Sequence, residues 1–228
     1  MAVSAGNAAI LAGLVARRCE GEPIAWLVGS VRFCDVPVLV EPGVYVPRWQ
    51  SEPMALEAVA RLPEEGTAVD LCTGSGAIAV VMSLARPRAL VLATEVDPVA
   101  AACARANGVD VVLCDMAQGI QPERRGTVDV VTAVVPYVPT EAMRHLPRDV
   151  VAYEPRRALD GGADGIDLLA RAVVEAAPLL CAGGSLLLEL GGQQAEALAP
   201  LLRANGYRDL QVSRDEDGDV RALFCRRR

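Results

Sequence analysis

Apolar runs of strand length alternate with helix-type stretches from Ser51 to the end of the chain. The strand-like runs are almost continuously apolar, which is typical of strands buried on both faces of a sheet. This alternation predicts an α/β fold with a doubly wound, seven-stranded sheet. The predicted strands are Ala68–Leu71, Leu90–Thr94, Val109–Leu113, Val128–Val134, Ser185–Leu190, Asp209–Val212 and Val220–Cys225, and the predicted helices that follow are Ala77–Leu84, Pro98–Asn107, Gly165–Leu180 and Gln193–Ala204.

The first 50 residues have a different pattern. Residues 1–16 are rich in alanine and predict a short helix. Residues 20–50 are rich in proline, glycine and β-branched types, and two short runs, Val31–Cys34 and Val38–Val40, predict a β-hairpin whose turn contains Pro37. We therefore divide the chain into residues 1–50, a short helix and hairpin, and residues 51–228, the main domain.

The composition is that of a globular chain. Of 228 residues, 52% are hydrophobic, and 22 basic against 29 acidic residues give a net charge of −7. Such a chain lacks the positive surface that nucleic-acid phosphates require. The seven cysteines form no Cys-x-x-Cys pair, which favours a reducing compartment. No uncharged apolar stretch of about 18 residues is present. We expect a cytoplasmic protein with no nucleic-acid or membrane partner, and no metal site.

A glycine-rich loop follows the first predicted strand of the main domain and precedes a helix. Glycines let the backbone approach a ligand closely, and free N–H groups at a helix start bind a carboxylate or a phosphate. Ala79 fills the third position of the G-x-G-x-x-G/A fingerprint, so the loop alone leaves a dinucleotide open, and a tight turn that binds nothing is the structural alternative. The candidate cofactor-binding residues of this loop are Asp70, Cys72, Thr73, Gly74, Ser75 and Gly76.

Acidic residues follow the next two predicted strands. Glu95 and Asp97 come about 20 residues after the glycine loop, where a carboxylate can accept both hydroxyls of an adenosine ribose. We assign this role to Glu95, with Val96 beside it, and Asp97, which is placed to cap the next helix, is the alternative. After the third strand, Asp115 could accept the adenine amino protons while Met116 covers the ring.

The glycine loop and the two acidic strand ends together resemble the class I S-adenosylmethionine methyltransferases. Within that class, the chain resembles the HemK-type protein-(glutamine-N5) methyltransferases. The resemblance implies a Rossmann-like domain, S-adenosyl-L-methionine as the cofactor, and a glutamine side-chain amide of a release factor as the methyl acceptor. It rests on five blocks that occur in the family's order, namely 21–29, 41–48, 70–77, 136–139 and 153–165.

The chain departs from this family where the family binds its acceptor amide. The family has Asn-Pro-Pro-Tyr after the fourth strand, and this chain has Val134, Val135, Pro136 and Tyr137. An asparagine can both donate to and accept from an amide, whereas valine can do neither. Pro136 and Tyr137 could still line the methyl-transfer channel, with the aromatic ring facing a sulfonium cation, or they could only pack this loop against the sheet.

Other residues of the matching region have two interpretations each. Arg48 and Glu154 are candidates for the acceptor site, but an ion pair of Glu154 with Arg48 or with a neighbouring arginine is equally consistent with the sequence. His145, the single histidine, could be a surface residue or a general base. The family's helical N-terminal domain, which grips the release factor, is longer than the 20 residues that precede the match.

These departures favour a divergent methyltransferase that acts on a small-molecule or peptide-like acceptor. Genuine glutamine methylation of a protein is the first alternative, and a non-catalytic protein that binds S-adenosylmethionine or a partner is the second. The exposed edge of the predicted hairpin also offers a pairing surface for a homodimer.

Overall fold

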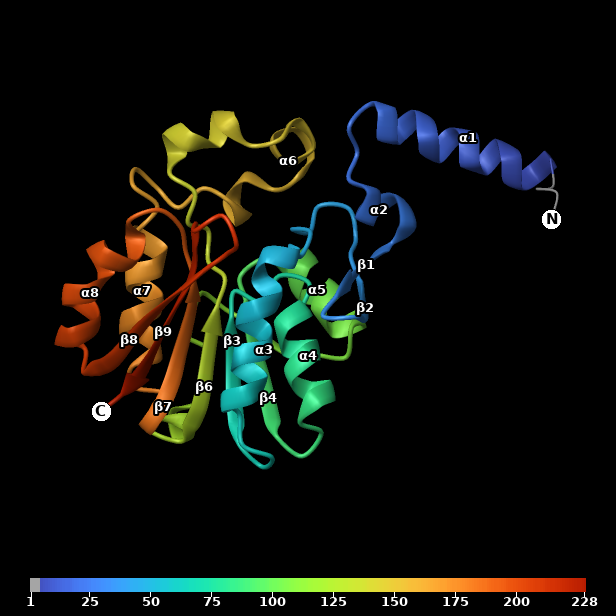
Figure 1. Ribbon diagram of the computed structural model, residues 1–228. Helices are drawn as coiled ribbons and strands as arrows, with labels where there is room; N and C mark the ends of the chain where they lie inside the picture. Colours follow the sequence, from blue (N-terminus) through green and yellow to red (C-terminus); the bar gives the residue numbers. More distant parts are fainter. Residues whose placement is uncertain (1–4) are drawn as a thin grey trace.

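The computed structural model describes residues 5–228 and shows a seven-stranded sheet with helices on both faces (Figure 1). The strand order is β5-β4-β3-β6-β7-β9-β8. Strands β5, β4, β3, β6 and β7 are parallel to one another, and β9 is antiparallel to both of its neighbours, β7 and β8. This arrangement confirms the doubly wound α/β fold. The strands are β3 (Thr67–Leu71), β4 (Leu90–Glu95), β5 (Asp110–Leu113), β6 (Val128–Ala133), β7 (Leu180–Glu189), β8 (Tyr207–Arg214) and β9 (Val220–Arg227).

Two apolar layers sandwich the sheet. Helices α7 (Asp167–Ala176) and α8 (Gln194–Ala204) cover one face, where their leucines and alanines pack on alternate residues of the strands. The other face is covered by α3 (Glu52–Arg61), α4 (Ala77–Ala85) and α5 (Pro98–Ala106). The strands are therefore buried on both sides, which explains why they are almost continuously apolar in sequence.

The predicted helix 165–180 is shorter than expected, and the strand after it is longer. The helix ends at Ala176, and Pro178 follows, which cannot continue a helix because it has no backbone N–H. Strand β7 then begins at Leu180, five residues before the predicted start, and its pairing with β6 contains a register shift between Val128 and Val130.

The N-terminal hairpin is present, but its turn was predicted wrongly. Strands β1 (Ser30–Phe33) and β2 (Val36–Leu39) are joined by Cys34 and Asp35, whose φ angles are 48° and 61°. A tight two-residue turn needs this left-handed backbone, which proline cannot adopt. Pro37 instead lies within β2, opposite Arg32, where an edge strand tolerates the missing N–H.

The hairpin packs on the main domain. Phe33 and Val38 are buried in the same apolar layer as α3 and α4. A short helix that the sequence did not predict, α2 (Ile24–Val28), precedes the hairpin and packs Trp26 beside Tyr153. The boundary drawn between residues 1–50 and 51–228 stays a prediction.

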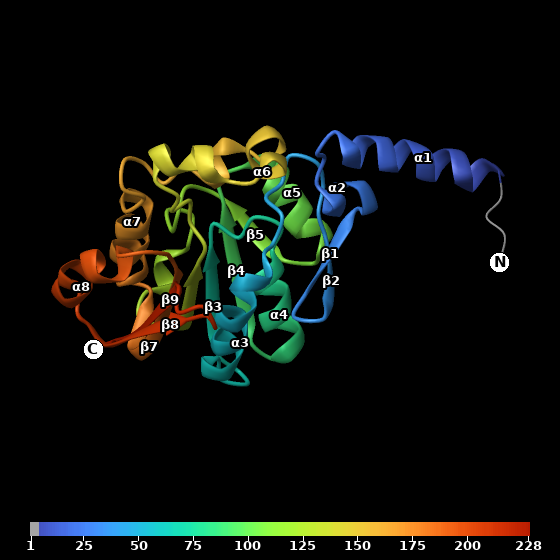
Figure 2. The same cartoon turned by 45° about the horizontal axis from the view of Figure 1, so that its top comes forward.

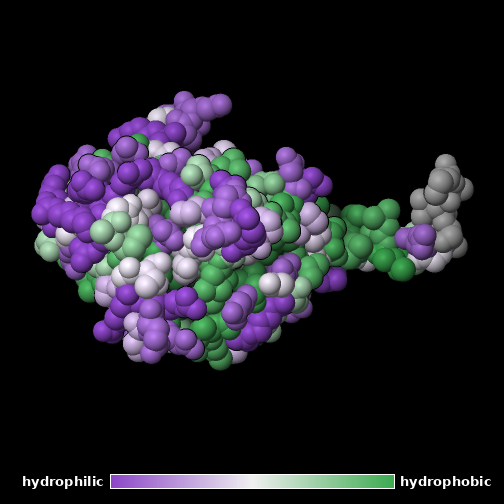
Figure 3. Space-filling view, turned by 90° about the horizontal axis from the view of Figure 1, so that it is seen from below, coloured by the Kyte–Doolittle hydropathy of each residue, from purple (hydrophilic) through white to green (hydrophobic). Residues whose placement is uncertain are grey.

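The predicted N-terminal helix is α1 (Ala5–Cys19), which projects from the sheet region (Figures 1 and 2), whereas residues 1–4 of that prediction lie outside the described residues. Ile10, Leu11 and Val15 are exposed on α1, and Figure 3 shows hydrophobic residues on this projection. None of the helices within residues 5–228 has the length and apolar character needed to span a membrane. The homodimer stays a prediction.

The parallel strands end together at one edge of the sheet. Asp70 of β3 is level with Ala93 of β4 and Thr132 of β6, and Ala133 of β6 is level with Leu188 of β7. The segments that follow β3, β4, β6 and β7 therefore meet in one place, and in this class of fold such an edge carries the ligand site.

Candidate active site

The glycine loop after β3 is organised by the buried carboxylate of Asp70. Asp70 is 2% exposed and accepts hydrogen bonds from the hydroxyls of Thr73 and Thr132, each at 2.6 Å. Gly76 has φ of 86°, and a Cβ atom there would lie 2.8 Å from Val109. Thr73 and Thr132 thus tie the loop to β6, and Gly76 permits close packing against the segment before β5.

Glu95 fastens the same loop from the end of β4. Its carboxylate is 8% exposed and accepts backbone N–H groups of Gly74, Val96 and Asp97 at 2.8–2.9 Å. A carboxylate offers about four acceptor positions, so this one retains room for a further donor. The structure therefore gives Glu95 a structural role that the sequence did not predict.

Asp97 caps a helix, as the sequence suggested for the case in which Glu95 and not Asp97 binds the ribose. Its Oδ1 accepts the N–H of Val99 at 2.9 Å at the start of α5, and its Oδ2 pairs with Arg157 at 2.6 Å. With both oxygens bound in this way, Asp97 holds α5 and the segment around Arg157 together.

Asp115 and Met116 are not among the residues that line the glycine-loop cavity described below, although Met116 contacts Cys72, which lines it. Asp115 is half exposed and pairs with Arg171 at 2.9 Å, whereas Met116 is 2% exposed and packs in the core with its sulfur 3.6 Å from that of Cys72. Burial raises the pKa of the Cys72 thiol, which agrees with a packed residue rather than a nucleophile. The adenine contacts assigned to Asp115 and Met116 stay predictions.

A cavity opens between the glycine loop, the segment before α3 and the segment after β6. It joins the predicted cofactor residues to the Val134–Tyr137 segment, which we call the acceptor loop. The segment 43–51 also lines it, and the block 41–48 was the sequence signal for that wall. The lining residues are Phe33, Gly43, Val44, Tyr45, Pro47, Ser51, Asp70, Cys72, Thr73, Gly74, Ser75, Ala77, Ile78, Glu95, Val96, Asp97, Ala100, Val134, Val135, Pro136, Tyr137, Val138, Pro155, Arg157, Ala158 and Leu159.

Arg48 and Glu154 form an ion pair. The sequence had left open whether they form this pair or contact the acceptor. The Glu154 side chain is buried and also accepts the N–H of Val46, and the Arg48 guanidinium lies 5.0 Å from the centre of the Tyr45 ring. Neither charged residue lines the cavity. The pair instead fixes the wall that contains Tyr45 against the segment after α6 (Arg148–Tyr153). An acceptor contact by either residue stays a prediction.

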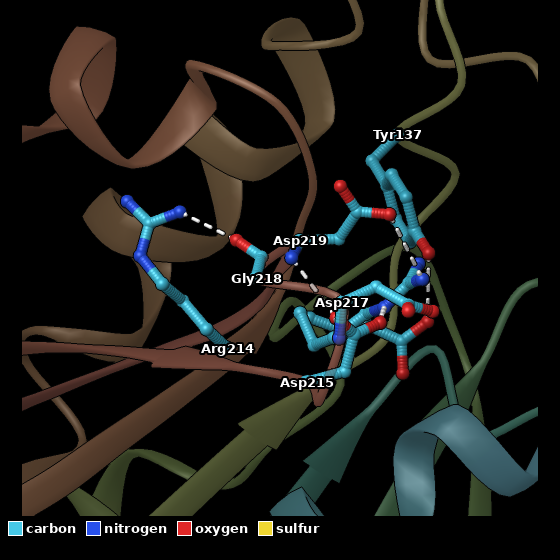
Figure 4. A network of polar contacts seen from close by, with 8 residues as sticks. Tyr137, Arg214, Asp215, Asp217, Gly218 and Asp219 are labelled. Atoms are coloured by element: carbon cyan, nitrogen blue, oxygen red, sulfur yellow. Dashed lines mark hydrogen bonds and ion pairs between the residues drawn. The ribbon is translucent and has the colours of Figure 1, made fainter.

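The acceptor loop is held through Tyr137. Its hydroxyl donates to Oε1 of Glu189 at 2.9 Å, and its carbonyl accepts from Gln194 at 2.8 Å. Figure 4 shows Tyr137 beside the turn between β8 and β9, which contains Asp215 and Asp219. Glu189 could not be identified from the sequence, because a carboxylate at a strand end does not indicate which loop it contacts.

His145 has the surface position that was one of its alternatives. It lies in the 3₁₀ segment Thr140–His145, is exposed, and accepts a hydrogen bond from the neighbouring Arg144 at 3.1 Å. It does not line the cavity. The structure gives no support to a general base at this position.

Buried carboxylates dominate the electrostatics of this edge. Asp70, Glu95 and Glu189 are all buried, and none has an ion-pair partner within residues 5–228. Burial raises the pKa of Asp70 to about 6, although the Thr132 and Thr73 hydroxyls oppose the shift. Burial also raises the pKa of Glu189. A cationic ligand would relieve this excess of buried negative charge.

The known proteins that are similar to this chain are methyltransferases. No protein-family model matches the chain. The release factor glutamine methyltransferases of Moorella thermoacetica and Geobacter sulfurreducens are 40% and 37% identical to it, over 93% and 92% of this chain and 77% and 75% of theirs. A 4-amino-L-phenylalanine/4-methylamino-L-phenylalanine methyltransferase of Streptomyces pristinaespiralis is 37% identical over 84% of this chain and 69% of its own.

Solved structures agree with these relatives. A release factor-specific protein-(glutamine-N5) methyltransferase from Alicyclobacillus acidocaldarius is 25% identical, with a TM-score of 0.52 over 82% of this chain and 98% of that one. A methyltransferase from Pyrococcus furiosus shares the fold, with a TM-score of 0.61 over 92% of this chain and 96% of its own at 20% identity. By sequence identity over most of both chains, this protein belongs to the release factor glutamine methyltransferase family.

Proposed function

We propose that this family member is an S-adenosylmethionine-dependent methyltransferase whose acceptor is a small-molecule or peptide-like amine rather than the glutamine amide of a release factor. The observation that carries the proposal is the apolar pair Val134 and Val135, which lines the cavity where the family's Asn-Pro stands. The relative from Streptomyces pristinaespiralis supports it, because the name of that protein describes methylation of an aromatic amine on a single amino acid.

The cavity fits a cationic cofactor. When bound, S-adenosylmethionine supplies an electrophilic methyl group on a positively charged sulfur. Asp70 and Glu95 line the cavity as buried carboxylates without a cation, which favours a ligand with sulfonium and ammonium groups over the anionic pyrophosphate of a dinucleotide. We assign the amino-acid end of the cofactor to Asp70, Thr73 and Gly74 and one ribose hydroxyl to the remaining acceptor position of Glu95.

The acceptor half of the cavity is apolar. Phe33, Val134, Val135 and Leu159 are apolar residues that line the cavity, and Tyr137 lines it as well. A glutamine amide entering there would lose water without gaining two replacement hydrogen bonds, and each unsatisfied polar group costs about 1–3 kcal/mol. A neutral amine has fewer polar atoms to satisfy, and its nitrogen lone pair is not delocalised into a carbonyl. These side chains exclude water and orient the acceptor nitrogen.

Glutamine methylation of a protein is the second candidate function. The names of the relatives favour it, because the Moorella thermoacetica and Geobacter sulfurreducens proteins are both release factor glutamine methyltransferases. A non-catalytic binding role is the third, since Val134 removes the group that would orient an amide. Methyl transfer to any acceptor excludes the non-catalytic role.

The acceptor assay uses S-adenosylmethionine, a panel of primary and secondary amines that includes aromatic amines, and a release factor with its glutamine-containing loop. We expect mass spectrometry to detect a methylated amine and no methyl group on the release-factor glutamine. Robust methylation of that glutamine would contradict the proposal.

Val134→Asn restores the side chain that orients an amide. We expect this variant to methylate a glutamine peptide about tenfold faster than the parent, which corresponds to one recovered hydrogen bond of about 1.4 kcal/mol. Val151→Asn is the matched control, because Val151 is exposed on α6 and does not line the cavity. Equal rates for the parent and the Val134 variant would show that this position does not set the acceptor.

Titration of Asp70 makes folding and cofactor binding depend on pH. Its pKa in the folded protein is about 6 against an ordinary value of 3.8, so the folded state holds its proton more tightly than the unfolded state does. The free energy of unfolding of the ligand-free protein should therefore fall by roughly 2–3 kcal/mol between pH 4 and pH 7. Affinity for S-adenosylmethionine should rise over the same range, because the ionised carboxylate attracts the cation.

Asp70→Asn removes this titration and keeps polar atoms next to both hydroxyls. Urea unfolding and calorimetry between pH 4.5 and 7.5 should give flatter profiles for this variant than for the parent. Asp217→Asn, at an exposed position in the turn between β8 and β9, is the control and should follow the parent. Parallel profiles for the parent and Asp70→Asn would assign the pH dependence to other groups.

Glu95 and Asp97 should differ in their effect on the cofactor. Glu95→Gln removes the charge that would accept a ribose hydroxyl, and we expect a loss of S-adenosylhomocysteine affinity of about tenfold or more. Asp97→Asn should lower the melting temperature through the α5 cap and the Arg157 pair, with a smaller effect on affinity. Calorimetry that finds equal affinity losses in the two variants would contradict the assignment of Glu95.

A further inference from the structure

A buried carboxylate that the cofactor does not explain lies at the end of β7. Glu189 is 4% exposed. Ala133 and Leu188 are paired across β6 and β7, so one residue further along come Val134, which begins the acceptor loop, and Glu189. The carboxylate is therefore beside the acceptor loop but is not itself a lining residue of the cavity.

Glu189 and Gln194 bind two polar groups of Tyr137, its hydroxyl and its backbone carbonyl. The Tyr137 hydroxyl donates to Glu189 Oε1 at 2.9 Å, and Gln194 Nε2 donates to the Tyr137 carbonyl at 2.8 Å. Gln194 is itself oriented, because its Oε1 accepts the N–H of Gly191 at 2.9 Å. One short segment thus controls both the ring and the backbone of the residue that ends the acceptor loop.

Close packing leaves the Tyr137 backbone little room to move. A Cβ atom on Gly165 would lie 2.1 Å from the Tyr137 carbonyl oxygen, and one on Gly161 would lie 2.7 Å from the Tyr137 Cα. The backbone is therefore enclosed by two glycines. The aromatic ring, in contrast, is fixed at its polar end by the single hydrogen bond to Glu189.

Few neighbouring groups stabilise the buried Glu189 carboxylate. Glu189 Oε2 is buried without a hydrogen-bond partner among residues 5–228. The hydroxyls of Ser51 and Tyr137 and the guanidinium groups of Arg48 and Arg221 only partly oppose the rise in pKa that burial causes. Both arginines are paired elsewhere, Arg48 with Glu154 and Arg221 with Asp215 and Asp219, two of the acids of the β8–β9 turn in Figure 4.

The Glu189 carboxylate lowers the free energy of unfolding, since a buried charge without a close counter-ion is unfavourable. Stability alone therefore does not explain why an acid stands here. Its direct contact with Tyr137 explains why a hydrogen-bond acceptor stands here, because the Glu189 oxygen accepts the phenol hydroxyl.

We propose that Glu189 is a positioning residue that sets the orientation of the Tyr137 ring, and through it the acceptor loop, in the methyl-transfer site. The proposal rests on the proposed function of that loop in holding the acceptor. Glu189 acts through Tyr137 and touches neither cofactor nor acceptor. The hydrogen bond requires only an acceptor oxygen at Oε1, so an amide at this position should serve almost as well as the carboxylate.

The first experiment measures hydrogen exchange of the segment 133–140, with β3 as an internal reference, and needs no acceptor. In Glu189→Leu and in Tyr137→Phe, exchange of this segment should rise about tenfold, and the double variant should exchange no faster than either single variant. Glu189→Gln should stay within about threefold of the parent. Glu196→Gln, at an exposed position on α8, is the matched control and should not change.

The second experiment uses whichever acceptor the amine panel or the release factor provides. Glu189→Leu should lower kcat about tenfold while the Kd for S-adenosylhomocysteine stays within about twofold of the parent, and Glu189→Gln should restore most of kcat. A purely structural role would instead lower cofactor affinity and kcat together. If Glu189→Leu does not fold, Tyr137→Phe breaks the same hydrogen bond and gives the same two measurements.

Unchanged loop exchange in Glu189→Leu, or additive effects in the double variant, would overturn the proposal. Failure of every acceptor to react would count against the proposed function but would leave the exchange result intact. The two claims are therefore tested separately.

Discussion

Buried negative charge is the constraint on which the site depends. Asp70, Glu95 and Glu189 lie at one edge of the sheet, where the carboxyl ends of β3, β4 and β7 meet, and within residues 5–228 none of the three pairs with a cation. A buried carboxylate persists only when other groups satisfy it. Asp70 and Glu95 each accept two or more hydrogen bonds, whereas Glu189 Oε2 has no hydrogen-bond partner among residues 5–228. This difference separates the proposed cofactor part of the edge from the proposed acceptor part.

The two acids of the cofactor part shape the backbone around them. Asp70 binds two threonine hydroxyls and ties the glycine loop to β6, whereas Glu95 binds three backbone N–H groups and fixes the same loop to the end of β4. Because both carboxylates line the cavity and neither has an ion-pair partner within residues 5–228, this part of the site favours a cation. The glycine loop is thus held in place before any cofactor binds.

The acceptor part has the opposite character. Val134 is apolar and lines the cavity, Val135 beside it is buried at 1% exposure, and Tyr137 of the same loop donates a hydrogen bond to Glu189. Valine stands where the family has the asparagine that can bind an amide, and the loop is held by the hydrogen bonds of Tyr137 to Glu189 and Gln194.

Much of this could be predicted from the sequence, because the signals were local. The apolar runs predicted β3, β4 and β6, and the glycines predicted the loop after β3. The position of Asp97 before Pro98 indicated the cap of α5. The turn of the hairpin was predicted wrongly, because proline was taken as the turn residue where a left-handed backbone was needed.

Features that depend on distant segments were not predictable in this way. The wall formed by Phe33 and the segment 43–51 faces Val134 and Val135, more than 80 positions further along the chain, and the contact between Glu189 and Tyr137 joins residues 52 positions apart. No periodicity or spacing encodes such contacts, since they arise only when the sheet brings strand ends together. Neither Asp115 nor Met116 lines the cavity, and their assignment to the adenine stays a prediction.

The most direct test of the account is a crystal structure of the protein with S-adenosylhomocysteine. We expect a ribose hydroxyl within about 3 Å of the Glu95 carboxylate and the sulfur directed at Val134 and Tyr137. A complex in which the ribose binds Asp97, or in which the sulfur points away from the acceptor loop, would contradict it.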